Sequence, residues 1–498
     1  MGSRDPLNRN RILFIQPPST MLRLQRLKSR RPALEAPLPF VYLAPYLLDA
    51  GFQVRVLDLR IDSIATLRRC LQNESPGIAG ISVMPGSMLK DTIEVTRRIK
   101  QWSPGTRVVW GGTFPSLHHE ICLQVDQLDF VVRGDGEITL LELASALRDG
   151  SGGADWDRIA GLAFMRGGAI VSSPDREPAD LERHPFGAWG ILDRYIEHYL
   201  GPLGQLSINT ARGCPFSCTF CYNTALYRGF NRYRAKSIEA SMEEIRFLQD
   251  RYQPRVLTFM DDDFLADRRR GIELLTSAHE SFPSLKYCID ARVNELDDTD
   301  RVSQLSRLGV ASAFFGVEAA SQHVLEQVRK GCDTQEAFEA ARNCATYGIA
   351  ATYSFTCGYP DETTEDLIRR IEMAAMLREL HQAGRSQIEI ISPVLGTPLF
   401  AELTRKQMVP HESVERWCHF SDWKSAREKR WIGDAKFYEA FQLAFYLAFS
   451  TQTRRDGSAR LLTEMLSRWS RFRLIGRRPR GLLEYRAANA LVKKLIWS

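Results

Sequence analysis

Short apolar runs alternate with amphipathic stretches through residues 11–150. Because short buried strands separated by helices build parallel sheets covered on both faces, this pattern predicts an α/β domain over residues 1–150, a doubly wound, Rossmann-like parallel sheet. In such sheets ligands bind beyond the carboxyl ends of the strands. The predicted strands are Arg11–Gln16, Val54–Leu59, Ile78–Val83, Val108–Trp110 and Phe130–Val132, and the predicted helices are Tyr42–Ala50, Ile64–Gln72, Leu89–Trp102 and Thr139–Asp149.

A second alternation of strands and helices begins at Gln205. It predicts a partial (β/α)6 barrel of the TIM type over residues 201–403, with its active site at the C-terminal ends of the strands. Residues 151–200 contain a possible hairpin and several prolines and are interpreted as a linker, and residues 404–498 as a helical C-terminal domain. The predicted barrel strands are Gln205–Thr210, Val256–Met260, Tyr287–Ala291, Ala313–Val317, Thr352–Thr356 and Gln387–Ser392.

Glycine-rich loops follow three successive strands of the first domain. Because glycine lets a backbone approach a ligand closely, their position predicts a large ligand across the sheet edge, and ordinary turn chemistry is the alternative. Asp58, at the end of the second strand, is a further candidate at this edge. The loop residues are Pro85, Gly86 and Ser87, then Gly111, Gly112, Thr113 and Phe114, then Gly134, Asp135, Gly136 and Glu137.

The net charge and the cysteine pattern limit which partners and which cellular compartment we expect for the protein. A net charge of +6 over 498 residues is mild and does not by itself suggest a nucleic-acid or membrane partner. The ten cysteines are scattered and do not resemble a secreted disulfide framework. Because Met1–Arg11 is too polar for a signal peptide and Phe437–Phe449 is too short to span a bilayer, we expect a cytoplasmic protein.

The most specific chemical signal is the set of Cys214, Cys218 and Cys221, directly after the first barrel strand. Three cysteines at such close spacing can surround one compact soft-metal site. There is no fourth cysteine nearby, whereas a structural zinc site normally has four ligands. Three thiolates on a [4Fe–4S] cluster would leave one iron open for a cofactor or substrate. A zinc site completed by a distant ligand is the alternative.

The cysteine spacing, with an aromatic residue before the last cysteine, resembles the radical S-adenosylmethionine (SAM) superfamily. Six further motifs resemble the subgroup with an N-terminal cobalamin-binding domain, the class B methyltransferases. These motifs are Gly111–Pro115, Arg133–Glu137, Met260–Phe264, Phe315–Ala319, Gly358–Thr363 and Pro393–Pro398. The resemblance implies a [4Fe–4S] cluster, SAM and cobalamin as cofactors, and a flavodoxin or ferredoxin as electron donor.

The resemblance also implies roles for four barrel residues. Glu318 would contact SAM, with a strand-end salt bridge as the alternative. Asp261, or one of its two aspartate neighbours, would reach the SAM or substrate region, with helix capping as the alternative. Arg292 would bind the SAM carboxylate, with a surface ion pair as the alternative. Tyr222 would pack near the adenine.

On the cobalamin side, the loops at residues 111–115 and 134–137 would cradle the corrin and its nucleotide tail. The chain lacks the Asp-x-His-x-x-Gly pattern of proteins that bind cobalt through histidine. The lower face of cobalt therefore has no assigned ligand, and the segment from Pro85 to Met88 is the candidate to face it.

Methyl transfer from SAM through cobalamin to carbon or phosphorus of a small molecule is the implied reaction. An oxidative cyclase or rearrangement enzyme of the porphyrin-cyclase type and a non-catalytic cobalamin or iron–sulfur sensor are the alternatives. An RNA methylthiolase would fit the Arg-rich segment 468–480. That class carries three further cluster cysteines in its N-terminal domain, and only Cys70 and Cys122 precede the barrel motif here.

Overall fold

The structure is a computed structural model. It describes residues 7–18, 34–84, 87–150, 156–184, 186–230 and 232–408, together with single positions between 414 and 445. The predicted helical domain over residues 404–498 therefore lies almost entirely outside the described residues, as do the Arg-rich segment and two of the sequence candidates, Pro85 and Gly86.

The first domain is the predicted α/β sheet, with strand order β2-β1-β3-β4-β5 and all of these pairs parallel. In this order the chain reverses direction across the sheet between β1 and β3, which is where ligands bind in open parallel sheets. The strands are β1 (Asn8–Gln16), β2 (Gln53–Asp58), β3 (Pro76–Ser82), β4 (Arg107–Gly111) and β5 (Phe130–Val132).

Helices cover both faces of this sheet because alternate strand residues point to opposite sides. Phe14 packs with the helices α2 and α6, whereas its neighbours Leu13 and Ile15 pack with α3, α4 and α5. This arrangement gives the doubly wound form that the alternation of the sequence predicts. The helices are α2 (Leu38–Asp49), α3 (Ile64–Glu74), α4 (Ser87–Trp102), α5 (Thr113–Cys122) and α6 (Gly136–Arg148).

The hairpin that we assigned to the linker continues the sheet of the first domain. Its strands β6 (Leu162–Arg166) and β7 (Ala169–Ser172) are antiparallel, and β6 pairs with β5. The chain then forms two short helices, η1 (Trp189–Tyr195) and α8 (Ile196–Leu200), before the barrel begins. The sequence shows the hairpin, but the strand that it joins is set by tertiary contacts.

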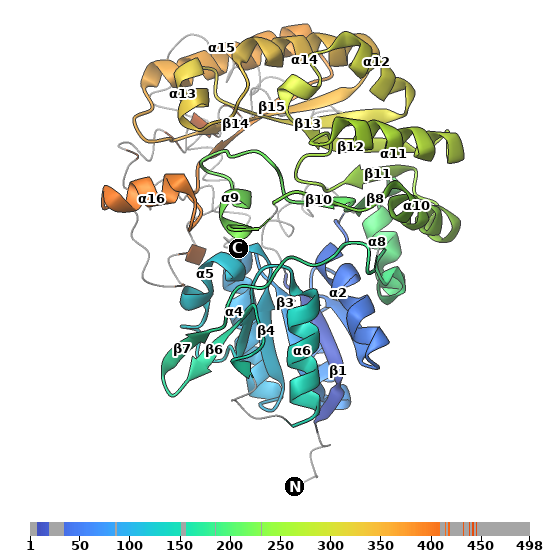
Figure 1. The fold of residues 1–498 in the computed structure, drawn as a ribbon, viewed down its shortest axis with the longest axis vertical. Coiled ribbons are helices and arrows are strands. Elements are labelled where there is room, and N and C mark those ends of the chain that lie inside the picture. Colours follow the sequence, from blue (N-terminus) through green and yellow to red (C-terminus); the bar gives the residue numbers. More distant parts are fainter. Residues whose placement is uncertain are drawn as a thin grey trace, which may run out of the picture.

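The second domain is an open barrel of six parallel strands, in the order β15-β14-β13-β12-β11-β8. Figure 1 shows it above the first domain, with the helices α11, α12, α14 and α15 on its outer side. The strands are β8 (Gln205–Ile208), β11 (Val256–Phe259), β12 (Lys286–Ala291), β13 (Val310–Glu318), β14 (Ala350–Cys357) and β15 (Arg385–Ile390).

Most helices of this domain begin at a residue whose side chain accepts a hydrogen bond from the first turn. For example, the side chain of Asp333 accepts hydrogen bonds from the first turn of α14, and that of Thr363 accepts one from the first turn of α15. The helices are α10 (Ile238–Tyr252), α11 (Arg268–Ser281), η2 (Val293–Glu295), α12 (Thr299–Arg307), α13 (Gln322–Gln327), α14 (Thr334–Tyr347), α15 (Thr364–Leu380) and α16 (Pro398–Arg405).

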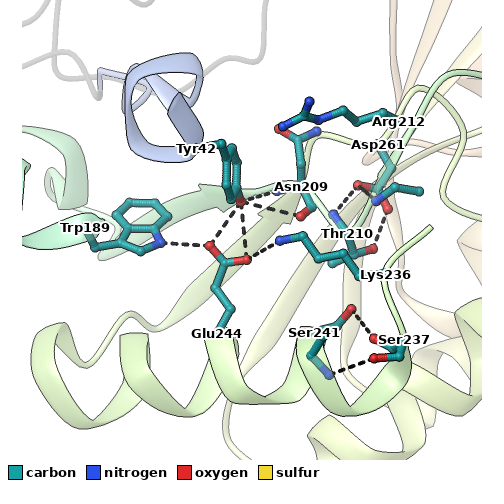
Figure 2. A network of polar contacts seen from close by, with 12 residues as sticks. Tyr42, Trp189, Asn209, Thr210, Arg212, Lys236, Ser237, Ser241, Glu244 and Asp261 are labelled. Atoms are coloured by element: carbon teal, nitrogen blue, oxygen red, sulfur yellow. Dashed lines mark hydrogen bonds and ion pairs between the residues drawn. The ribbon is translucent and has the colours of Figure 1, made fainter. Parts of the chain in front are cut away.

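A buried polar network joins the two domains (Figure 2). Tyr42 of α2 donates a hydrogen bond to Glu244 of α10 at 3.0 Å and accepts one from the backbone of Asn209 at 3.1 Å. Glu244 also accepts from the indole of Trp189 at 2.8 Å and forms an ion pair with Lys236 at 2.7 Å. Because a buried charge is costly unless it is paired, this network defines how the domains dock.

No helix among the described residues is long and apolar enough to cross a membrane.

Candidate functional site

The three cysteines lie on a loop that leaves the barrel beside its first strand. The loop begins after β9 (Ala211–Arg212) and ends at the short helix α9 (Asn223–Leu226). Cys218 is buried, and Cys214 and Cys221 are half-buried. Burial raises the pKa of Cys214 to about 12 and that of Cys221 to about 11, so metal binding must displace protons from these thiols.

Asp262 connects the two ends of the cysteine loop. Its carboxylate accepts a hydrogen bond from the backbone of Gly213 at 2.9 Å and another from the phenol of Tyr222. Gly213 precedes Cys214, and Tyr222 follows Cys221. One side chain from the end of β11 therefore sets the span of the loop that carries all three thiols.

Asp261, the aspartate that we assigned to cofactor binding, faces the protein instead. One of its oxygens accepts from the backbone nitrogens of Thr210 and Ala211, at 2.6 and 2.9 Å, and the other accepts from the Thr210 hydroxyl at 2.5 Å. Both carboxylate oxygens are thus used to hold the end of β8. Of the three consecutive aspartates, Asp262 is the one that lines the interdomain cavity described below.

Gly213 is required by the shape of the loop. Its φ is +75°, a conformation that residues with a side chain rarely adopt, and a Cβ there would lie 1.5 Å from the carbonyl oxygen of Arg232. The antiparallel pairing of Arg212 with Arg234 brings the two segments this close.

Arg292 follows β12 and reaches the cysteine loop. Its Nη1 lies 3.8 Å from the Sγ of Cys218, and its guanidinium lies 3.9 Å from the ring centre of Phe216. The side chain is 5% exposed, which excludes the surface ion pair that we considered as the alternative.

Glu318 ends β13 at a positive φ of 66° and faces the same region. Its carboxylate pairs with Lys330 at 3.1 Å and accepts a hydrogen bond from Thr356 at 2.6 Å. Burial lowers the pKa of Lys330, but the charge of Glu318 outweighs this effect and the pKa is raised. The strand-end ion pair that we considered as the alternative for Glu318 is therefore present. Glu318, Lys330 and Thr356 meet at the C-terminal end of the barrel.

A cavity of about 280 Å³ lies between the carboxyl edge of the first sheet and the barrel. One end is an apolar slot between the sheet and the helices α2 and α6. Glycine loops form one wall, and the residues around the cysteine loop form the other. The slot is lined by Phe14, Leu43, Val109, Val132 and Leu140, the glycine wall by Gly111, Gly112, Thr113, Gly134, Gly136 and Glu137, and the barrel wall by Asn209, Arg212, Tyr222, Met260 and Asp262.

Ion pairs join the third glycine loop, residues 134–137, to β9 and to its partner strand β10 (Arg234–Ala235), which lie on either side of the cysteine motif in the sequence. Glu137 pairs with Arg212 at 2.7 Å, and Asp135 pairs with Arg234 at 2.8 Å. Burial raises the pKa of Asp135, but the charges of Arg212 and Arg234 outweigh it and the pKa is lowered. The loop that we assigned to cofactor binding thus also fixes the first domain against the cysteine motif.

Two other sequence candidates, Asp58 and Phe114, are not among the described residues that line the cavity. Asp58 is fully buried and is held by Arg60 at 2.6 Å and by Tyr199 at 2.8 Å, so it anchors α8 to the first sheet. Phe114 is buried and stacks on His118. Ser87 is the first residue of α4.

Two family models match the chain, one for each domain. Residues 208–374 match the radical SAM superfamily, and residues 29–144 match the B12 binding domain. The chain is a radical SAM enzyme with a B12-binding domain. The barrel, with its three cysteines, and the α/β domain, with its cavity, are the two units that these models describe.

Similar proteins include both methyltransferases and cyclases. An uncharacterized methyltransferase of Pyrococcus horikoshii is 29% identical over 73% of this chain and 77% of its own length. The anaerobic magnesium-protoporphyrin IX monomethyl ester cyclase of Synechocystis sp. is 27% identical over 73% of this chain and 72% of its own length.

Among solved structures, the radical SAM methyltransferase TsrM from Kitasatospora setae, with cobalamin and a [4Fe-4S] cluster bound, has the same fold. Its TM-score is 0.65, at 20% identity, over 80% of this chain and 75% of that one.

The donor set of the radical SAM domain fits an iron–sulfur cluster. Three thiols share one loop whose ends are tied together, and Arg292 places buried guanidinium nitrogens beside it. Among the described residues, Nε and Nη2 of Arg292 have no hydrogen-bond partner. Nitrogen donors of this kind can form hydrogen bonds to the sulfur atoms of a cluster.

Sequence reasoning did not predict that Asp262 connects the two ends of the cysteine loop. It also did not predict the ion pairs of Lys330 with Glu318 and of Arg212 with Glu137. Lys330 carries no spacing signal, because it lies in the loop after α13 and meets Glu318 only through the fold. Arg212 stands two residues before Cys214, so its position in the motif could have marked it as a candidate.

Proposed function

We propose that this radical SAM enzyme is a cobalamin-dependent methyltransferase that acts on a small molecule. The observation that carries the proposal is the shared cavity. It is lined on one side by the glycine loops of the B12-binding domain and on the other by Tyr222 of the cysteine loop and by Asp262, which follows β11. A corrin ring on the glycine loops would therefore face the site where SAM binds.

Each part of the cavity has a distinct task in this proposal. The glycines at 111, 112, 134 and 136 let the backbone approach the corrin closely, and the apolar slot between Phe14 and Leu140 accepts the nucleotide base of the tail. Cys214, Cys218 and Cys221 hold the cluster, while Glu318 and Lys330 bind the polar end of SAM. When bound, the cluster supplies an electron to SAM and cobalamin carries the methyl group.

The inner wall of the barrel provides the substrate site. Tyr287, Ile289 and Ala291 of β12 pack outward in the core, so Asp290 lies on the opposite, inner face of the strand. Phe314, its neighbour in register on β13, is 37% exposed. A carboxylate beside an exposed ring suits a small molecule with both polar and apolar parts. An external low-potential protein, such as a flavodoxin or ferredoxin, would supply the electrons.

Anaerobic reconstitution with iron, sulfide and hydroxocobalamin tests the proposal. We expect a corrinoid spectrum, a cluster signal that changes when SAM is added, and formation of S-adenosylhomocysteine under reducing conditions. A protein that binds corrinoid but yields neither S-adenosylhomocysteine nor 5′-deoxyadenosine would be a sensor. A protein that holds zinc with four protein ligands would contradict the proposal altogether.

The similarity to the Synechocystis cyclase favours oxidative ring closure as a second candidate. The two reactions separate on incubation with magnesium-protoporphyrin IX monomethyl ester and SAM that carries a deuterated methyl group. An unlabelled, oxidised product would support the cyclase. A labelled product from this or another substrate would support methyl transfer.

A further inference from the structure

The guanidinium of Arg292 contacts the cysteine loop at two points. It donates toward the Sγ of Cys218 over 3.8 Å and lies 3.9 Å above the ring of Phe216. Arg292 comes from the end of β12, and its backbone nitrogen is fixed by Glu295 at 2.9 Å. The side chain is therefore directed at a cysteine sulfur by a barrel strand and lies over the ring of Phe216 in the cysteine loop.

The charge of this arginine is not neutralised by a direct ion pair within the described part of the chain. Glu295 accepts a hydrogen bond from the backbone nitrogen of Arg292, and the residue is 5% exposed. The charges of Asp263 and Glu295 act on the guanidinium, but neither carboxylate forms a direct ion pair with it. Its Nε and Nη2 have no partner among the described residues. A buried cation of this kind is stable only if a negative group is close. Beside the charges of Asp263 and Glu295, a cluster ligated by three thiolates would be a negative group within reach of the unpaired Nε and Nη2.

We propose that Arg292 raises the reduction potential of the cluster by donating to Cys218 and placing a positive charge beside it. Reduction adds one electron from a low-potential donor to the cluster and breaks no bond. The added negative charge is stabilised by a cation and by a hydrogen bond to a ligand sulfur, and both effects make reduction easier. Arg292 is thus a positioning and tuning residue for the cluster, whereas the resemblance alone assigned it to the SAM carboxylate.

The test is the reduction potential of the reconstituted cluster, measured without SAM by redox titration with electron paramagnetic resonance detection. Arg292→Lys keeps the positive charge, Arg292→Gln removes the charge, and Arg292→Met removes both the charge and the hydrogen-bond donors. We expect the potential to shift to more negative values in the order Lys, Gln, Met. Arg301→Gln is the matched control, because Arg301 holds the same turn through the carbonyl of Glu295 but does not contact a cysteine, and its potential should equal that of the unsubstituted protein.

A second measurement needs no substitution. Protein labelled with ¹⁵N-arginine should show a weak nitrogen coupling to the reduced cluster in pulsed electron paramagnetic resonance. Its absence would overturn the proposal even if the variants at position 292 fail to fold.

The experiment also separates this inference from the proposed function on which it rests. A protein that assembles no [4Fe–4S] cluster contradicts the proposed function. A cluster whose potential is unchanged in Arg292→Gln and Arg292→Met, with weaker SAM binding, contradicts the inference alone and returns Arg292 to the SAM carboxylate.

Discussion

Asp262 accepts a hydrogen bond from the phenol of Tyr222, and this contact closes the cysteine loop at its far end. The same carboxylate accepts from the backbone of Gly213 at the near end. Because Tyr222 and Asp262 also line the interdomain cavity, the contact couples the geometry of the cysteine loop to the wall of this cavity.

A double-mutant cycle should reveal this coupling. Hydrogen bonds to a charged group contribute about 1.5–3 kcal/mol, so Asp262→Asn and Tyr222→Phe should each lower the free energy of unfolding and the iron content after reconstitution. Because both remove the same bond, the double variant should be less destabilised than the sum of the two. Strictly additive effects would show that the contact is absent in solution.

Gly213→Ala should abolish cluster assembly. The new Cβ would collide with the carbonyl of Arg232, in addition to the strain of about 1–2 kcal/mol for a side chain at positive φ. Gly229→Ala is the matched control, since its φ is +84° but nothing lies within 4 Å of the added carbon. Iron analysis should find the cluster in the control and not in Gly213→Ala, and equal iron in both would refute the requirement.

Thr113→Trp should block the proposed corrinoid site without affecting the cluster. Thr113 is half-buried at the start of α5 and lines the cavity, so an indole there would occupy the space of the corrin. We expect at least about tenfold weaker hydroxocobalamin binding, equivalent to 1.4 kcal/mol, with unchanged iron content. Thr113→Ser should bind as the unsubstituted protein does, and corrinoid binding at full affinity by Thr113→Trp would place the site elsewhere.

Asp290→Asn should stabilise the protein at alkaline pH. Burial, followed by the charges of Asp262, Glu35 and Asp261, raises the pKa of Asp290 from 3.8 to about 7. Between these values the folded protein keeps a proton that the unfolded chain has lost, so stability falls as the pH rises through this window. Urea unfolding should show that the gain from Asp290→Asn is larger at pH 8 than at pH 4. A gain independent of pH would mean that Asp290 has an ordinary pKa.

The folds of both domains were predictable because their signals are local. Short apolar runs separated by helical stretches favour parallel sheets with covered faces, and β1 to β5 and the six barrel strands follow this pattern. The 162–172 hairpin shows the limit of such reasoning. Its turn is visible in the sequence, but its pairing with β5 depends on which sheet edge is free after folding.

The candidate site was predictable in part for the same reason. The positions of the glycine loops at the strand ends placed most of them in the cavity, because the carboxyl ends of parallel strands share one edge. Asp58 and Asp261 also stand at strand ends, yet the carboxylates of both accept hydrogen bonds from other groups of the protein. Strand position alone does not say whether a carboxylate faces a ligand or a neighbouring backbone.

The sequence by itself determined the three-cysteine motif, the two α/β units and the glycine edge, since spacing within one loop and periodicity within one element are local properties. The tertiary structure alone decided that Asp262 ties the loop, that Lys330 meets Glu318 and that Arg292 reaches Cys218. These contacts join residues 12 to 74 positions apart. Strand register and domain docking determine such contacts, and neither leaves a local pattern in the chain.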